Sequence, residues 1–403
     1  MNCNAMPAVG QVLRSKTFVR RGYRSLQGTH LSTWTIRYRA ISMWSACVLL
    51  SSVSACSNDS RSDDEARQSV NFYNWYNDLN PTALPEFTKT TGIQVIHDVY
   101  DSDEILESKM LVGNSQYDVI VPASGNFARQ RAAGLLHELD RSKLHNYREL
   151  DPELLSKLDV IDPGNRYGVP YNWGTTGIGY NVELIRKRMS DAPLDSWALI
   201  FDPEIAKRFQ DCGIAIVDSP GDVVPSALSY LGRNLVSQDP KDLADAMLVV
   251  ARIQPFVRYF YSSQIADDLA TGQICIALSW SGSVLEAQRA SDLDLRYAIP
   301  KEGALLWFEL MAIPADAPNL ENAHRLIDFL IDPHVAAGYT NAIFYPSGVA
   351  SAREFVESSI RELPGVYPPP DVRQRIFTGP PETPEYERQR SRLWAAAKAG
   401  RMN

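Results

Sequence analysis

Aromatic residues and acids recur at places where the sequence predicts that a buried strand ends. These candidates are Trp75, Tyr76, Asn77 and Asp78, then Asp222, then Trp280 and Ser283, then Trp307 and Glu309, and finally Tyr345. Flat aromatic faces attract an organic cation, and a buried ammonium group needs carboxylates or several acceptors in place of its water. Each cluster alone could instead pack a core or cap a helix, but together the clusters favour a site for an organic cation.

The same residue types give few signs of catalysis. The six His are scattered without the spacing of metal ligands, and no G-x-S-x-G nucleophile motif occurs. A pair of acids for glycoside hydrolysis stays possible on the sequence alone. The glycines at 174, 177 and 179 read GxxGxG, which favours a hinge over a nucleotide site. We therefore expect a binding protein with neither metal nor cofactor, and not an enzyme.

Charge is distributed unevenly along the chain. Residues 1–55 hold seven Lys or Arg and no acid, whereas the remainder holds 33 basic and 48 acidic residues, a formal charge of −15. An acidic body repels nucleic acid and attracts cations, although solubility alone explains such a charge as readily. We expect no nucleic-acid partner.

The N-terminus has the pattern of an export signal. Arg37 and Arg39 precede an apolar run of about fifteen residues, typical of a secretory signal and shorter than a membrane-spanning helix. The end of the run, VSAC at 53–56, resembles the lipobox of bacterial lipoproteins, in which Cys56 would carry the lipid. A plain signal peptide cleaved nearby is the alternative. We expect a signal at 1–55, whose true start can lie after Met1, and a flexible tether at 56–68.

Cysteine usage agrees with export. Cys3 and Cys47 would leave with the signal and Cys56 would take lipid, so Cys212 and Cys275 remain. In an oxidising compartment such a pair indicates a disulfide, and two separate buried thiols are the alternative. The absence of a C-x-x-C spacing disfavours a zinc or redox site.

Length and pattern predict an α/β chain with two lobes. A chain of 403 residues, 45% of them hydrophobic, is too long for one compact core. Strands alternate with helices, which favours mostly parallel sheets. Strands are expected at 70–73, 92–96, 117–122, 213–218, 274–279 and 306–314, and helices at 104–111, 321–331 and 333–339. Two lobes that bury little between them commonly hinge about a ligand, which binds outside the carboxyl ends of the strands.

Six collinear stretches carry a resemblance to a known family: FYNWYND, TGIQVIHDVYDSDEILESKM, VPYNWGTTGIGYNV, DLATGQICIALSW, IPKEGALLWFEL and GVYPPPDVRQRIF. They are similar to bacterial periplasmic putrescine- and spermidine-binding proteins of ABC importers, the putrescine-binding branch most of all. The resemblance implies the periplasmic solute-binding fold, with two α/β lobes joined by a hinge of two crossings. Lobe 1 would comprise 69–176 and 303–368, and lobe 2 would comprise 177–302 and 369–403. It further implies a monomeric periplasmic receptor that passes a small linear polyamine to ABC permease subunits.

The resemblance also implies roles for the aromatic candidates. Trp75 and Trp280 match stacking tryptophans of the family. Trp307 stands at another aromatic position, and Tyr345 matches a late tyrosine. Ser124 lies in a loop that corresponds to a serine-bearing loop of the family but is shifted.

Among the acids, Glu309 stands where the family has an amine-binding Asp, and Asp222 matches an acidic ligand contact. Two positions depart from the family. Ser283 stands where relatives carry an Asp, and the acid that follows Trp75 in relatives is here replaced by Asn77 or moved to Asp78. We therefore expect one amine held at Glu309, with a ligand whose other end is altered, longer or less charged. A receptor or sensor for another small cationic amine is the alternative.

The resemblance adds to the expectation for the cysteines, because Cys212 and Cys275 fall where putrescine-binding relatives form a disulfide.

Overall fold

The computed structural model describes residues 68–76 and 78–402. The predicted signal, Cys56, all but the last residue of the tether, and Asn77 lie outside these residues. In the described ranges no helix has both the length and the apolar character needed to cross a bilayer.

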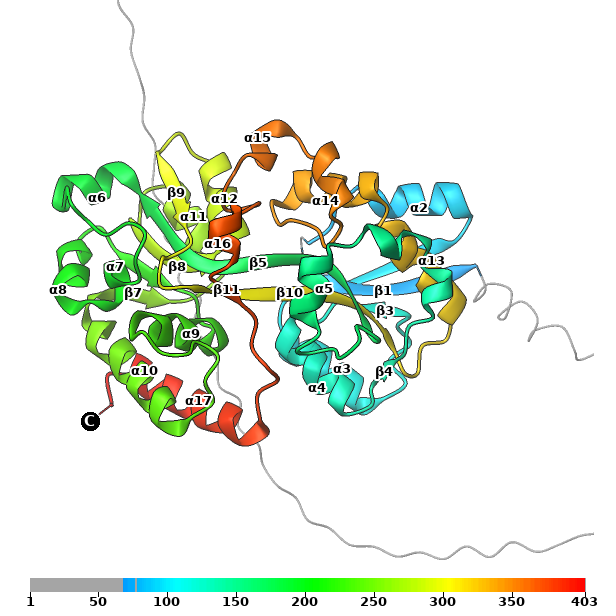
Figure 1. Cartoon of the computed structure of the whole chain (residues 1–403), viewed down its shortest axis with the longest axis horizontal. Helices are drawn as coiled ribbons and strands as arrows, with labels where there is room; N and C mark the ends of the chain where they lie inside the picture. Colours follow the sequence, from blue (N-terminus) through cyan, green and yellow to red (C-terminus); the bar gives the residue numbers. More distant parts are fainter. Residues whose placement is uncertain (1–67, 77, 403) are drawn as a thin grey trace, which may run out of the picture. The chain divides into compact units, whose positions relative to one another are not determined.

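Eleven strands of the described residues form one mixed sheet (Figure 1). Their order is β2-β1-β3-β10-β5-β8-β6-β7, and in addition β4 and β11 pair with β10 and β9 pairs with β5. The strands are β1 (Ser69–Trp75), β2 (Gln94–Tyr100), β3 (Val119–Ile120), β4 (Leu136–His137), β5 (Gly168–Asn181), β6 (Ile214–Ile216), β7 (Val257–Phe260), β8 (Ile276–Trp280), β9 (Leu295–Ala298), β10 (Ala304–Pro314) and β11 (Ile376–Phe377).

Pairing in the sheet changes from parallel at its two ends to antiparallel between them. β1 is parallel to β2 and β3, and β6 is parallel to β7 and β8. The long strands β5 and β10 are antiparallel to each other and to β8 and β3, because the chain returns along β10 in the opposite direction to β5. The expected parallel pairing is therefore found at the ends of a sheet that is mixed as a whole.

Helices flank the strands along the chain. The α-helices are α2 (Ala83–Thr91), α3 (Asp103–Val112), α4 (Ser124–Ala132), α5 (Pro152–Leu158), α6 (Val182–Arg188), α7 (Ala198–Phe201), α8 (Pro203–Ala206), α9 (Pro220–Tyr230), α10 (Pro240–Ile253), α11 (Ile265–Ala270), α12 (Ser281–Arg289), α13 (Leu320–Leu330), α14 (Pro333–Ile343), α15 (Ser358–Arg361), α16 (Pro370–Arg373) and α17 (Pro384–Lys398). Short 3-10 helices are η1 (Arg141–Lys143), η2 (His145–Glu149), η3 (Lys207–Phe209), η4 (Gln254–Phe256) and η5 (Ser351–Phe355).

Four of these helices begin at an Asp-Pro pair, which explains where they start. In α5, α8, α10 and α14 the Asp side chain accepts a hydrogen bond from a backbone N–H of the first turn. The Pro that follows has a backbone already suited to the first helical position and no N–H to leave unpaired. The capping Asp residues are Asp151, Asp202, Asp239 and Asp332.

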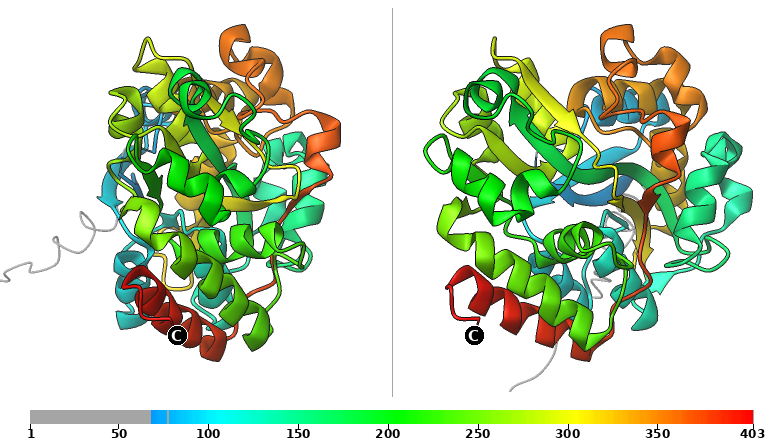
Figure 2. Two further views of the ribbon diagram at one scale, coloured as in Figure 1. Left: turned by 90° about the vertical axis from the view of Figure 1, so that its left-hand side faces the viewer. Right: turned by 60° about the vertical axis from the view of Figure 1, so that its left-hand side comes forward.

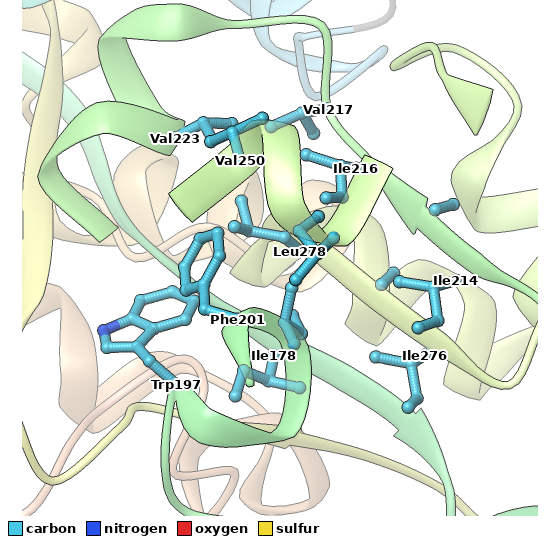
Figure 3. Close-up of a cluster of buried hydrophobic side chains, with 14 of the residues drawn as sticks. Ile178, Trp197, Phe201, Ile214, Ile216, Val217, Val223, Val250, Ile276 and Leu278 are labelled. Carbon is cyan, nitrogen blue, oxygen red and sulfur yellow. The ribbon is translucent and has the colours of Figure 1, made fainter. Parts of the chain in front are cut away.

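Buried apolar side chains gather in three clusters. The first surrounds β6 and β8 and includes Leu278 of β8, Phe201 of α7 and Trp197, the residue before α7 (Figure 3). The C-terminal helix α17 joins this cluster and lies against α10 (Figure 2). The other two lie on opposite faces of β1, since Phe72 belongs to one and Tyr73 to the other. The division into lobes stays a prediction, and the first cluster, drawn from residues 178–295 and 386–397, supports it.

A disulfide joins Cys212 to Cys275, with 5.5 Å between their Cα atoms. The bond links Cys212, which lies between η3 and β6, to Cys275, which directly precedes β8, and both cysteines belong to the first cluster. The predicted disulfide is thus confirmed.

Candidate functional site

The neighbouring strands β5 and β10 carry several candidate side chains. In their antiparallel register Asn172 lies opposite Glu309, and Gly174 lies opposite Trp307. Because strand side chains alternate between faces, Asn172, Gly174 and Thr176 share one face of β5. The register shifts immediately after Glu309, and such bulges commonly redirect a side chain near a binding site.

Asp78 and Glu309, here called the carboxyl pair, meet at the amide of Asn172. The Nδ2 of Asn172 donates to Oε2 of Glu309 at 2.6 Å and lies 3.4 Å from Oδ2 of Asp78. The Tyr339 hydroxyl donates to the other oxygen of Asp78 and accepts from the same amide at 2.7 Å. Asp78 is only 8% exposed. In the part of the chain that the structure describes, no basic side chain neutralises either carboxyl.

Both members of the carboxyl pair have raised pKa values. Burial raises the pKa of Asp78 to about 6, and the hydrogen bond from Tyr339 offsets part of the increase. Burial, together with the nearby negative charge of Asp78, raises the pKa of Glu309 well above its ordinary value. Two carboxyls in contact do not readily ionise together. The pair therefore holds a proton more tightly than an ordinary carboxyl does.

Trp307 and Tyr345 stack above two glycines. A Cβ at Gly174 would lie 2.2 Å from a ring carbon of Trp307, and one at Gly282 would lie 2.3 Å from Cζ of Tyr345, so both positions need glycine. The two rings meet edge to face, with centroids 5.1 Å apart. Burial raises the pKa of the Tyr345 phenol, and hydrogen bonds with Ser283 lower it in part. The aromatic surface thus extends from β10 to the first turn of α12.

Asp222 stands at the opposite end of the same face of β5. It lies in the first turn of α9 and is 8% exposed. The hydroxyls of Thr176 and Ser219 donate to its two carboxylate oxygens, the second at 2.6 Å. Thr176 is four residues beyond Asn172, about 13 Å along an extended strand. β5 therefore links Asp222 to the carboxyl pair.

The two tryptophans predicted to stack on a ligand both end a strand. Trp75 is the last residue of β1 and packs against Tyr100, with ring centroids 4.7 Å apart. Its buried Nε1 has no hydrogen-bond partner among the described residues. Trp280 is the last residue of β8 and lies opposite Thr176 of β5. Their contact with a ligand stays a prediction.

Among the described residues, Tyr76 and Ser124 form no side-chain hydrogen bond with these groups. Tyr76 is 65% exposed, and Asn77 lies outside the described residues. The Ser124 hydroxyl accepts from the Phe308 N–H at 2.7 Å and donates to the Phe308 carbonyl at 2.9 Å. Ser124 thereby fixes the start of α4 beside Glu309. Ligand contacts of all three stay predictions.

Sequence reasoning missed the polar residues that organise the acids. Asn172 and Thr176 lie beside the glycines that the sequence predicts as a hinge, and Tyr339 ends a predicted helix. Asp103 was also missed, although burial raises its pKa to about 6 and its charge contributes to the raised pKa of Glu309. The spacing of Asn172 and Thr176 on one strand face was the available signal.

A hollow of about 1000 Å³ lies elsewhere, lined by residues of α2, η1, η2, α13 and α14. Its walls mix acids such as Glu86 and Glu321 with bases such as Lys143 and His145. None of the described residues predicted for the site lines it. Within 68–76 and 78–402, no cluster of His, Cys, Asp or Glu could hold a metal ion.

Comparison with known proteins decides the family. Residues 82–364 match the family described as bacterial extracellular solute-binding protein. The chain belongs to this family.

Individual relatives of this solute-binding protein align with more than four fifths of the chain. The putrescine-binding periplasmic protein SpuD of Pseudomonas aeruginosa is 41% identical over 338 residues, which are 82% of this chain and 92% of the relative. The putrescine-binding periplasmic protein PotF of Escherichia coli is 39% identical over 342 residues, 83% of this chain and 92% of the relative. The spermidine/putrescine ABC transporter substrate-binding protein PotD from Streptococcus pneumoniae aligns with a TM-score of 0.74 at 26% identity, covering 83% of this chain and 99% of that one.

These similarities confirm three expectations from the sequence. The resemblance to polyamine-binding periplasmic proteins of ABC transporters is confirmed, and so is the α/β solute-binding fold. Because the family consists of binding proteins, the expectation that the chain is not an enzyme is confirmed as well.

Proposed function

We propose that this solute-binding protein captures a small linear polyamine in the periplasm and delivers it to the permease of an ABC importer. The observation that carries the proposal is the carboxyl pair, which meets at Asn172 without a basic side chain beside it in the described residues. An organic cation would supply the missing charge. The relatives named as putrescine-binding or spermidine/putrescine-binding support this ligand class.

The aromatic surface beside the acids suits the rest of such a ligand. Each aromatic face stabilises an ammonium group by roughly 0.5 to 2 kcal/mol, depending on how far it is desolvated. Each buried methylene contributes about 0.8 kcal/mol, best between flat rings such as Trp75, Trp280 and Trp307. The carboxyl pair compensates the ammonium for its lost water.

The opposite end of the ligand would meet a different environment. Asp222 is the acid available there, with its oxygens already accepting from Thr176 and Ser219. Ser283, where relatives carry an Asp, hydrogen-bonds with Tyr345 instead of offering a charge. One amine would therefore bind firmly at the carboxyl pair, and the other end would be held less by charge.

Capture would be completed by closure of the two predicted lobes, residues 69–176 with 303–368 and residues 177–302 with 369–403. Arg129 supports this arrangement because it forms ion pairs with Glu107 of α3 at 3.0 Å and with Glu387 of α17 at 2.6 Å. The first pair stays within lobe 1, and the second joins lobe 1 to lobe 2. The packing of Tyr345 over Gly282 joins the same two lobes.

The proposal includes export and anchoring. The basic and apolar pattern that ends at VSAC supports removal of residues 1–55 and attachment of lipid to Cys56. The lipid would hold a monomeric receptor at the membrane, near the permease subunits.

A receptor or sensor for another small cationic amine is the second candidate function. It is favoured by the loss of the family's acid at Ser283 and by Asn77 after Trp75. Such a protein would use the same carboxyl pair but would prefer a ligand with a single strong charge.

Calorimetric titration of the exported protein tests the proposal. The panel is putrescine, cadaverine, agmatine, spermidine, spermine and the basic amino acids. At least one linear amine is expected to bind with micromolar affinity, which corresponds to about −8 kcal/mol. A panel without any binding amine would contradict the proposed function, and binding of a basic amino acid alone would favour the second candidate.

A further inference from the structure

The carboxyl pair combines close contact between two acids with the lack of a neutralising cation. Asn172 Nδ2 lies within 2.6 Å of Glu309 and 3.4 Å of Asp78, so both acids share one donor. Tyr339 donates to the remaining oxygen of Asp78. Two ionised carboxylates this close in a buried place repel each other strongly. A proton held between the two acids would relieve this repulsion.

Among the described residues, no basic group faces the carboxyl pair. The titratable groups that face the pair are Tyr171 of β5, Tyr100 of β2, Tyr339 of α14, Tyr345 after α14, and Asp103 of α3. Burial raises the pKa of each of these tyrosines, so their phenols stay neutral. Asp103 adds negative charge, which strengthens the retention of a proton by the pair.

We infer that the carboxyl pair exchanges its shared proton for the ammonium group of the ligand, so that amine capture releases one proton. This inference rests on the proposed function. The carboxyl O–H bond breaks, the proton passes to solvent, and N–H donors of the ammonium replace it between the two acids. Net charge in the site is unchanged by the exchange, because one positive charge replaces another.

Raised pKa values of both acids support the exchange and determine whether amine affinity rises or falls with pH. Burial raises the pKa of Asp78 to about 6, and that of Glu309 is raised further above its ordinary value by burial and by Asp78. An ammonium of the lysine type stays charged near neutral pH, so the ligand itself neither gains nor loses a proton. Affinity should therefore rise with pH, by about tenfold per unit while one full proton is released.

Calorimetry can count the proton directly. Putrescine and spermidine are titrated into the protein at about pH 7 in phosphate and in Tris, whose ionisation enthalpies differ. The difference in observed binding enthalpy gives the number of protons released. For the natural protein we expect close to one, and the dissociation constant should fall as pH rises.

Two variants separate the pair from the other acid of the site. Asp78→Asn removes the partner that raises the pKa of Glu309, so proton release should fall to near zero. Asp222→Asn makes the same change of charge at the other end of β5, and it should weaken binding while proton release stays near one.

The outcomes distinguish this inference from the function on which it rests. Binding with no proton release and a pH-independent affinity would overturn the exchange but leave amine capture intact. Failure of every polyamine to bind would remove both. The count on the natural protein is decisive even where Asp78→Asn does not fold.

Discussion

Asn172 and Glu309 face each other across β5 and β10, and the amide of Asn172 donates to Oε2 of Glu309 at 2.6 Å. The same amide reaches Tyr339 and lies near Asp78, so one neutral side chain organises two acids. Strand pairing fixes both residues before any ligand arrives. The carboxyl pair is thus a preformed feature of the sheet.

Trp280→Ala is expected to weaken amine binding by about tenfold or more, because it removes both a cation-attracting face and apolar cover for the methylenes. Trp280→Phe keeps a flat ring at the end of β8 and should lose much less. Calorimetric titration of both variants with the tightest-binding amine measures the difference. Equal losses in the two variants would show that the flat ring is not what binds.

Ser283→Asp should strengthen putrescine binding, because it replaces a hydroxyl with a second carboxylate at the end of the site where Asp222 is the available acid. The gain should be largest at low salt, where surface charges are least screened. Ser283→Asn has a similar size without the charge and should bring no gain. Equal putrescine affinity in Ser283→Asp and Ser283→Asn would contradict the claim that a missing carboxylate at Ser283 weakens binding at this end of the site.

Ligand-free protein should lose stability as pH rises through the raised pKa values of the carboxyl pair. Folded protein holds a proton there more tightly than the unfolded chain does, so this contribution is present at low pH and lost at high pH. Asp78→Asn removes the repulsion. Its melting temperature relative to the natural protein should therefore increase between about pH 5 and about pH 8.

The natural protein and Asp78→Asn share their titratable groups elsewhere in the chain. The difference between their melting temperatures therefore excludes the effects of those groups. A difference in melting temperature that does not change with pH would mean that the carboxyl pair is already fully ionised in the empty protein.

Reduction of the Cys212–Cys275 disulfide should lower stability by about 2 to 4 kcal/mol, because the bond closes a long loop within the first core cluster. Thermal unfolding with and without a reductant measures the loss. The double variant Cys212→Ser with Cys275→Ser should start lower and be insensitive to the reductant. An unchanged melting temperature of the natural protein on full reduction would count against a stabilising role.

Features that depend on one segment could be predicted from the sequence. Trp75 and Trp280 stand at the ends of short apolar runs, and Glu309 lies in the run where the chain returns to the first predicted lobe. Such runs indicate buried strands. Export left Cys212 and Cys275 as a pair, and the family resemblance added to the expectation of a disulfide. The parallel ends of the sheet followed from the alternation of strands and helices.

Features that depend on distant segments could not be predicted. Asp78 and Tyr339 are 261 positions apart, and no local pattern connects them. β5 is buried on both faces, so its polar residues do not alternate with apolar ones in the usual way. The sequence pattern therefore does not distinguish Asn172 as a site residue. The antiparallel middle of the sheet depends on the return of β10, which sequence periodicity does not reveal.

The most direct test of the account is the effect of Glu309→Gln on amine affinity, measured by calorimetry beside Glu286→Gln. Glu286 is an exposed residue of α12 and serves as the matched control. We expect Glu309→Gln to weaken binding by about tenfold or more, since it leaves the buried ammonium with one acid, whereas Glu286→Gln should have no effect. Equal affinity in Glu309→Gln and the natural protein would contradict the claim that an amine binds at the carboxyl pair.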